Sequence, residues 1–226
     1  MLFELSHLIV IDKVSLDLSV DESLKIGQLG RIADKVDNMD KRLEECKKLI
    51  KPTALYTYTK IEQVSKEGLL IDNNRLLKST KLAEQLSCST EIAPYIITIG
   101  PDLEKRVTSI ATDKILDSWI LDNLGTYALR TLGKHIEERI RNEKGWKISR
   151  FNPGSTPTWN LEEQEKIFGI FSKETVQEKI GVRLTDTFMM IPKKSVSGVM
   201  GQAISDYHNC IECRLACEYR QMPYKE

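Results

Sequence analysis

The clearest pattern in the chain is a stripe of apolar residues within residues 103–142. It runs through Ile120, Leu124, Ala128, Leu132, Ile136 and Ile140. The interval of four residues is close to the 3.6-residue period of an α-helix with one buried face. The pattern predicts two helices that are separated near Thr112 and Asp113, and the second is expected to pack across a sheet.

Three shorter segments also show helical patterns. The first begins near Asp40, carries Cys46 on its apolar stripe, and ends before Pro52. Cys46 is therefore expected to be a small buried hydrophobic residue rather than a ligand. The second begins after Ser79, a typical N-cap, and runs through Leu86.

The third short helix follows Asn160, with Glu163 placed as a capping box requires. Its apolar face is predicted to consist of Leu161, Gln164, Phe168 and Phe171. Gly181 ends this helical region. Trp159, immediately before the cap, is expected to be exposed.

Strand-like segments alternate with these helices. They are residues 2–18, 55–61, 68–71, 92–99, the segment that leads to Arg150, and two short strands hinged at Pro192. Pro94 is expected to place its strand at an edge or a bulge. The prediction is an α+β fold with a twisted, mainly antiparallel sheet packed by helices. One domain is expected over residues 1–202, followed by a cysteine-rich extension over residues 203–226.

Composition excludes several classes of protein. Lys plus Arg and Asp plus Glu are both 33 in 226 residues, so no global charge points to nucleic acid or to an anionic membrane. No stretch approaches the roughly 18 apolar residues that span a bilayer, and the N-terminus lacks a signal-peptide pattern. We expect a soluble cytoplasmic protein.

The turn after Arg150 is the first candidate ligand site. Pro153 fixes a turn and Gly154 permits close approach of a ligand, and an arginine just before such a turn can hold a carboxylate or a phosphate. The alternative is an ordinary connection with a surface arginine. The candidate binding residues are Arg150, Asn152, Pro153, Gly154, Ser155 and Trp159.

The C-terminal cysteines are the second candidate site. Cys210, Cys213 and Cys217 follow a Cys-x-x-Cys-x-x-x-Cys spacing that suits an iron–sulfur cluster or zinc. His208 is the candidate fourth ligand for zinc. An iron–sulfur cluster requires a further ligand from Cys88, Cys46, another chain or a substrate. The alternative is a helix in which each cysteine packs singly.

The segment from Arg150 to Gly201 resembles a known family. Its ordered pattern consists of Ile180, Gly181, Leu184, Thr185, Asp186, Thr187, Phe188, Met190, Pro192 and Ser195 to Gly198. A shorter Arg-x-x-x-Gly-Tyr turn is matched by Arg150 and Gly154, with Ser155 in place of the tyrosine. This pattern resembles the reactivation (activation) domain of cobalamin-dependent methionine synthase, here in a stand-alone form with a cysteine-rich tail. The resemblance covers about the last third of the chain and extends more faintly to residue 90.

The resemblance implies a role in cobalamin chemistry. The family's domain closes over a protein-bound corrinoid and delivers a methyl group from S-adenosylmethionine while a reductant supplies an electron. This rescues cobalt that has been oxidised from Co(I) to Co(II). The chain is therefore expected to act in trans on a corrinoid protein or a cobalamin-dependent methyltransferase. The electron is expected from a donor such as flavodoxin or ferredoxin, or from an iron–sulfur centre in the tail.

Two other interpretations remain open. In one, the chain is a non-catalytic docking module for a corrinoid methyltransferase, with a structural zinc in the tail. In the other, reactivation proceeds without S-adenosylmethionine. Ser155 lacks the aromatic surface of the family's tyrosine, and Lys134 aligns with a position that is acidic in the family. Because Lys134 would repel a sulfonium, S-adenosylmethionine is expected to bind weakly or not at all.

Overall fold

A computed structural model describes residues 8–25, 29–72, 74–213, 217, 220 and 222–224. The main sheet has eight strands in these residues, and every strand pairing is antiparallel. The strands are β1 (Ile9–Ile11), β2 (Thr53–Tyr56), β3 (Thr59–Val64), β4 (Gly68–Ile71), β5 (Arg75–Lys78), β6 (Glu91–Thr98), β7 (Ile148–Phe151) and β10 (Ser195–Gln202). A separate pair is formed by β8 (Arg183–Leu184) and β9 (Met190–Ile191).

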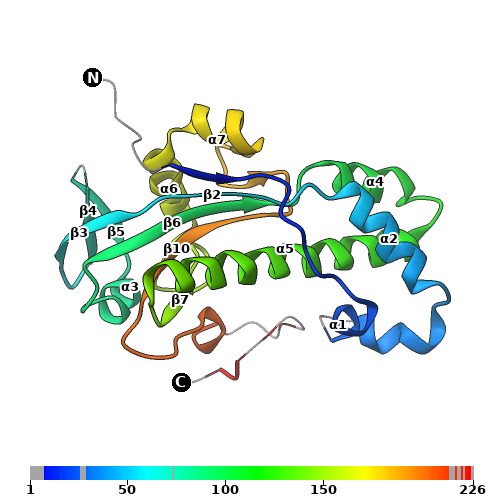
Figure 1. The fold of residues 1–226 in the computed structure, drawn as a ribbon, viewed down its shortest axis with the longest axis horizontal. Helices are drawn as coiled ribbons and strands as arrows, with labels where there is room; N and C mark the ends of the chain where they lie inside the picture. Colours follow the sequence, from blue (N-terminus) through cyan, green and yellow to red (C-terminus); the bar gives the residue numbers. More distant parts are fainter. Residues whose placement is uncertain are drawn as a thin grey trace.

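Helices cover both faces of the sheet (Figure 1). They are α1 (Val20–Leu24), α2 (Met39–Leu49), α3 (Thr80–Gln85), α4 (Asp102–Ile110), α5 (Ile115–Lys144), α6 (Gln164–Phe171) and α7 (Lys173–Ile180). Short 3-10 helices span Leu29–Lys35, Leu161–Glu163 and Asn209–Ile211. The predicted α+β fold with an antiparallel sheet is confirmed, as are the two helices over 103–142.

The alternating side chains of β6 divide the core into two clusters. Tyr95 and Ile97 point into the first, which includes the fully buried stripe of α5 and residues of α2 and α4. Ile92 and Ile96 point into the second, which includes α3, α6 and α7. Cys46 lies in the first cluster with no solvent exposure, and this burial raises the pKa of its thiol to about 12. The prediction that Cys46 is a buried hydrophobic residue is confirmed.

The central position of β6 corrects the expectation for Pro94. One edge of β6 pairs with β2 and then with β3, and the other edge pairs with β10. The carbonyl of Pro94 accepts a hydrogen bond from Thr57 N at 3.2 Å, in the gap between β2 and β3. Because the nitrogen and the carbonyl of one strand residue face the same side, the missing N–H falls at that gap. Pro94 therefore lies in the middle of the sheet and not at its edge.

Several local predictions are wrong. The strand expected over 55–61 is divided between β2 and β3, and β5 was not predicted. Trp159 is only 2% exposed and belongs to the second core cluster. Glu163 forms no capping box: its carboxylate accepts a hydrogen bond from Lys78 N at 2.7 Å and pairs with Lys166 Nζ at 2.6 Å.

The first residues of the predicted extension pack against the sheet. Ala203 N donates a hydrogen bond to Lys147 O at 3.1 Å. Tyr207 is 8% exposed, and its ring stacks on Phe151 with the ring centres 5.0 Å apart. The boundary at residue 202 stays a prediction. In the described ranges, none of the helices combines the length and apolar character needed to cross a membrane.

Candidate functional site

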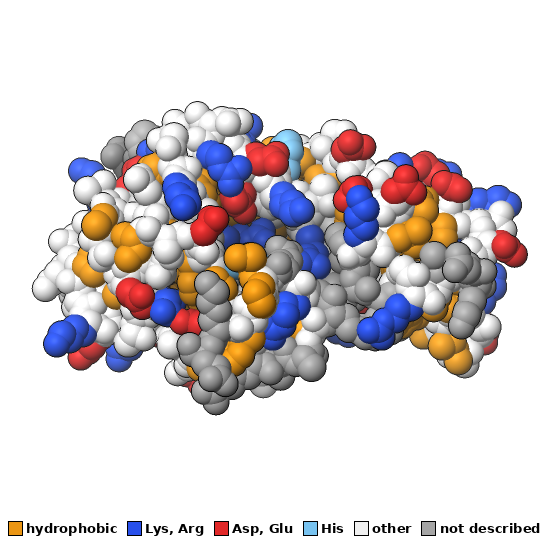
Figure 2. Space-filling view, turned by 90° about the horizontal axis from the view of Figure 1, so that it is seen from below, with side chains coloured by type: hydrophobic (Ala, Val, Ile, Leu, Met, Phe, Trp, Pro, Cys, Tyr) orange, Lys and Arg blue, Asp and Glu red, His pale blue; other side chains and the backbone are white. Residues whose placement is uncertain are grey.

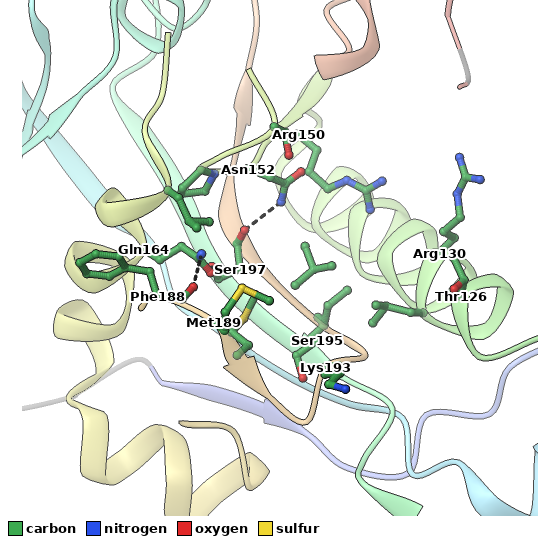
Figure 3. Close-up of a pocket in the computed structure, with 17 residues that line it drawn as sticks. Thr126, Arg130, Arg150, Asn152, Gln164, Phe188, Met189, Lys193, Ser195 and Ser197 are labelled. Atoms are coloured by element: carbon green, nitrogen blue, oxygen red, sulfur yellow. Dashed lines mark hydrogen bonds between the residues drawn. The ribbon is translucent and has the colours of Figure 1, made fainter. Parts of the chain in front are cut away.

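A cavity of about 420 Å³ lies beside the N-terminal half of β10, which extends beyond its pairing with β7 (Figure 3). Among the described strands, β7 pairs with β10 only over Val199 to Gln202. The edge of β10 from Ser195 to Ser197 therefore faces the cavity instead of another strand. The lining comprises Ile97, Thr126, Leu129, Arg130, Arg150, Asn152, Pro153, Ser155, Leu161, Gln164, Phe188, Met189, Met190, Lys193, Ser195, Val196 and Ser197.

Four of the six predicted binding residues line this cavity. They are Arg150, Asn152, Pro153 and Ser155. Gly154 does not line it but shapes the turn: its φ is +77°, and its N–H bonds to Trp159 O at 2.8 Å. Trp159 does not line it either, because its side chain is buried in the second core cluster.

Arg150 enters the cavity from β7. Strand alternation directs it to the same face as Ile148, which packs toward α5. Gly133 of α5 makes room for it, since a Cβ at that position would lie 2.2 Å from Arg150 Nη1. Figure 3 shows the half-buried guanidinium directed toward α5.

Asn152 connects the cavity wall to three other parts of the fold. Its Nδ2 donates to Ser197 O at 2.9 Å and to the hydroxyl of Tyr95, and its Oδ1 accepts from Asn209 Nδ2 at 3.0 Å. Burial raises the pKa of Tyr95, while the nearby Arg150 charge and the Asn152 hydrogen bond act in the opposite direction. The amide thus fixes the end of β7 to β10, β6 and the C-terminal segment.

Gln164 supports the opposite wall. Its Nε2 donates to Phe188 O at 3.0 Å, and its Oε1 accepts from Ser197 Oγ at 3.1 Å. Phe188 has a positive φ of 59°, which a residue with a large side chain adopts only when its surroundings hold it. These bonds hold the loop that presents Met189, whose side chain is 54% exposed at the cavity mouth.

The cavity walls that come from α5 and β10 were not predicted from the sequence. Those lining residues include Thr126 and Arg130 on α5, and Lys193, Ser195 and Ser197 near the start of β10. The polar residues at every second position after Pro192 were a usable signal for a half-polar strand. The contribution of α5 has no such signal, because it depends on how the helix crosses the sheet.

A second cavity, of about 480 Å³, shares Arg150 with the first. It is lined by Lys134, Glu137, Glu138, Arg141, Ile148, Ser149, Arg150, Asp206, Tyr207, His208 and Met222. On the face shown in Figure 2, Lys and Arg side chains gather around a hollow near the middle. Lys134 thus lines the second cavity and not the first. Arg150 is the residue through which the two cavities meet.

The cysteine segment lies next to this region. Cys210 and Cys213 are half-buried, Cys88 and Cys217 are exposed, and none of the five cysteines forms a disulfide within the described residues. The Arg220 guanidinium donates to Cys210 O at 2.7 Å and to Cys213 O at 2.6 Å.

Metal ligation by the cysteine segment stays a prediction. His208 Nδ1 accepts a hydrogen bond from Cys210 N at 3.1 Å. Among the described residues, no three or more His, Cys, Asp or Glu side chains are gathered as metal ligands. Cys46 is enclosed in the first core cluster. The predicted ligands Cys210, Cys213 and Cys217, with His208 or Cys88 as the fourth, would therefore have to be drawn together by the metal.

Comparisons with known proteins agree with the resemblance noted in the sequence. Residues 131–215 match the family described as vitamin B12 dependent methionine synthase, activation domain. The fold is similar to that in the crystal structure of the MetH reactivation domain bound to AdoHcy, with a TM-score of 0.60 and 14% sequence identity. That match covers 89% of this chain and 80% of the other. No curated protein sequence matches the chain. The predicted resemblance to the activation domain and the predicted fold are confirmed, whereas the stand-alone form with a cysteine-rich tail stays a prediction.

Proposed function

We propose that the chain is a reactivation partner that acts in trans on a corrinoid protein or a cobalamin-dependent methyltransferase. The observation that carries this proposal is the position of the first cavity. Of the described residues that line it, all but Ile97, Thr126, Leu129 and Arg130 fall within residues 131–215. The part of the chain that carries the family pattern is therefore the part that shapes a ligand site.

The cavity residues suit contact with a partner-bound cofactor. Arg150 supplies a cation, and Ser155 and Asn152 supply hydrogen-bonding groups at the wall. Part of the mouth is apolar, since the lining residues Leu161 and Met189 are 38% and 54% exposed. Exposed apolar side chains beside a polar cavity favour an interaction surface for a protein.

Reactivation also requires an electron for the oxidised cobalt. A flavodoxin or ferredoxin type of donor would deliver it from outside, whereas an iron–sulfur centre in the tail would deliver it from this chain. The tail is well placed for this role, because Asn209 bonds to Asn152 at the cavity wall and Cys210 is the next residue. Zinc in the same segment would have only a structural role, and the chain would then be a docking module.

The reactivation role can be tested with a corrinoid protein captured from anaerobic extract and then purified. With titanium(III) citrate as the reductant, the chain is expected to accelerate the loss of the Co(II) corrinoid spectrum. Arg150→Ala should abolish the acceleration, whereas Lys60→Ala, which removes an exposed charge on β3, should not. The proposal fails if the wild-type chain leaves the rate of reduction unchanged.

The tail is tested by metal analysis of protein purified without oxygen. A brown protein that contains iron supports an electron-transfer centre, and a colourless protein that contains zinc supports the docking module. Thiolate ligation predicts that replacing Cys210, Cys213 and Cys217 by serine removes the metal. Cys46→Ser, outside the tail, is expected to retain it. The same metal content in the triple variant would exclude these three ligands.

A further inference from the structure

Cys210 and Cys213 stand at the two ends of a tight turn. The 3-10 helix Asn209–Ile211 supplies the first central residue of the turn, and Glu212 supplies the second, with φ −100° and ψ −8°. These are the dihedral angles of a type I β-turn, in which the Cα atoms of the first and fourth residues lie within about 7 Å. The Cα atoms of disulfide-bonded cysteines are usually roughly 4.4–6.8 Å apart. The turn therefore brings Cys210 and Cys213 into the range that a disulfide bond spans.

Glu212, between the two cysteines, anchors this turn to the rest of the fold. Its carboxylate accepts hydrogen bonds from the Tyr207 hydroxyl at 3.2 Å and from Thr158 Oγ1 at 3.4 Å. It also pairs with Lys81 Nζ, on α3, at 3.0 Å, and its side chain is only 20% exposed. A turn that is held closed keeps its two thiols at a higher effective concentration than a flexible chain does.

The backbone of the turn is also fixed by a later residue. One guanidinium, that of Arg220, donates to Cys210 O at 2.7 Å through Nη1 and to Cys213 O at 2.6 Å through Nη2. The planar guanidinium is rigid, so it reaches both carbonyls only while the two ends of the turn are close. Arg220 and Glu212 thus stabilise the same closed turn from the backbone and from the side chain.

A pair of cysteines requires less of this segment than a metal site does. In the part of the chain that the structure describes, no group of three or more His, Cys, Asp or Glu side chains is assembled for a metal ion. A disulfide needs only the two residues that the turn already brings together. Cys88 and Cys217 are exposed and Cys46 is buried, whereas Cys210 and Cys213 are both half-buried.

We propose that Cys210 and Cys213 form a reversible disulfide in the metal-free chain by exchange with a low-molecular-weight disulfide of the glutathione class. One protein thiolate attacks a sulfur of the oxidant, which forms a mixed disulfide and releases one reduced thiol. The second protein thiolate then attacks the protein sulfur of the mixed disulfide and releases the other reduced thiol. The two protein thiols lose two electrons, the oxidant gains them, and the two protons pass to the released thiols.

This disulfide would control whether the tail can take up a metal. Metal ligation requires thiolates, and a disulfide offers none, so oxidation of the pair and metal binding exclude each other. The inference goes beyond the proposed function and does not depend on it. Oxidation is measured on the chain alone, so failure of the reactivation assay leaves the disulfide undisturbed, and failure of the disulfide leaves the reactivation role standing.

Equilibration in glutathione redox buffers tests the inference. The full chain is purified without oxygen, treated with a metal chelator and equilibrated at several ratios of reduced to oxidised glutathione. Free thiols are then alkylated, and the chain is cleaved after glutamate, which separates the two cysteines at Glu212. Mass spectrometry should find Cys210 and Cys213 as a cross-linked peptide pair. Cys88 and Cys217 should stay alkylated or carry glutathione singly.

The contribution of the fold is measured by repeating the equilibration in urea that unfolds the chain. The equilibrium constant for disulfide formation should be about tenfold smaller or less there, because the anchored turn is lost. The inference is overturned if the cross-link involves Cys88 or Cys217, or if only single glutathione adducts accumulate on Cys210 and Cys213. Equal constants in the folded and the unfolded chain would also overturn it.

Variants of Glu212 test the anchored turn itself. Glu212→Ala should lower the equilibrium constant about tenfold, and Glu212→Gln, which keeps an accepting oxygen for the two hydroxyls, should lower it less. Glu84→Ala is the matched control, because Glu84 pairs with the same Lys81 Nζ at 2.7 Å but lies on α3, outside the turn. Thermal unfolding should show that each variant is folded. An unchanged constant in folded Glu212→Ala would overturn the role of the anchored turn.

Discussion

Individual residues around the cavity differ in how far their sequence context reveals their role. Arg150, Asn152, Pro153 and Ser155 could be predicted as site residues because the chemistry of a turn is local. The burial of Trp159 could not be predicted, because it depends on α6 and α7 folding back over the same face of the sheet. Whether a residue beside a helix cap is exposed or buried depends on how segments distant in the sequence pack around it.

Cys46 leads to a prediction about pH. Burial raises the pKa of its thiol to about 12, whereas an unfolded cysteine titrates near ~8.5. Between these values the unfolded chain loses a proton that the folded chain keeps, so the free energy of unfolding falls as pH rises. The contribution approaches about 1.4 kcal/mol per pH unit.

Urea denaturation between neutral and strongly alkaline pH measures this effect. The stability of Cys46→Val should decline less steeply than that of wild type above pH ~9. Burial also raises the pKa of Tyr56 and Tyr207, but these residues are present in both proteins and cancel in the difference. Cys88→Ser, which removes an exposed thiol, is the matched control. Parallel curves for Cys46→Val and wild type would contradict the assignment.

At the scale of elements, sequence patterns predict what each segment does alone better than what it pairs with. The stripe of α5 was predictable because its period reports burial of one face. The strand over 68–71 was predictable as a short apolar run that is buried along its length. The central place of β6 was not, because Pro94 is accommodated by a gap between two other strands. The cavity walls from α5 and β10 follow from that sheet order.

The contact between β7 and β10 depends on a glycine. A Cβ at Gly198 would lie 2.1 Å from the backbone oxygen of Phe151 and 2.7 Å from Asn152 Nδ2. Because backbone cannot move aside cheaply, Gly198→Ala should lower the free energy of unfolding by about 1–3 kcal/mol. Displacement of Asn152 should also slow the proposed reactivation.

Chemical denaturation and the reactivation assay of the same preparations test this pair of effects. Gly169→Ala is the control, since its nearest contact would be the Arg75 guanidinium at an ordinary 3.5 Å. Within α6, alanine at this position should be neutral or stabilising by up to about 1 kcal/mol. Equal stability of Gly198→Ala and wild type would show that β7 can shift without cost.

At the scale of the whole molecule, the predicted extension and the domain share a core. Tyr207 stacks on Phe151, its N–H bonds to Ser149 Oγ at 3.3 Å, and its hydroxyl bonds to Glu212 at 3.2 Å. Burial and the nearby charge of Glu212 raise the pKa of this hydroxyl. The first residues after β10 thus pack into the second core cluster through Ala203 and Tyr207.

A chain that ends at Ser205 should still fold cooperatively, because all described strands and α-helices end before that residue. Loss of the Tyr207 ring should lower the free energy of unfolding by about 3 kcal/mol, as for other buried aromatic side chains. Tyr207→Ala in the full chain should reproduce most of this loss in denaturation experiments. An aggregated product from the truncated chain, with a stable Tyr207→Ala variant, would instead assign the folding requirement to residues beyond Tyr207.

The place of β10 in the sheet has a consequence for synthesis on the ribosome. This strand comes late in the chain, yet it lies between β6 and β7, and Ser195 pairs with Thr98. Until residue 202 has left the exit tunnel, β6 has one bare edge and β7 has no neighbour. Open strand edges invite pairing with other chains, so the nascent protein is vulnerable to aggregation until β10 has emerged. The sheet can close only after β10, which also builds the cavity, has emerged.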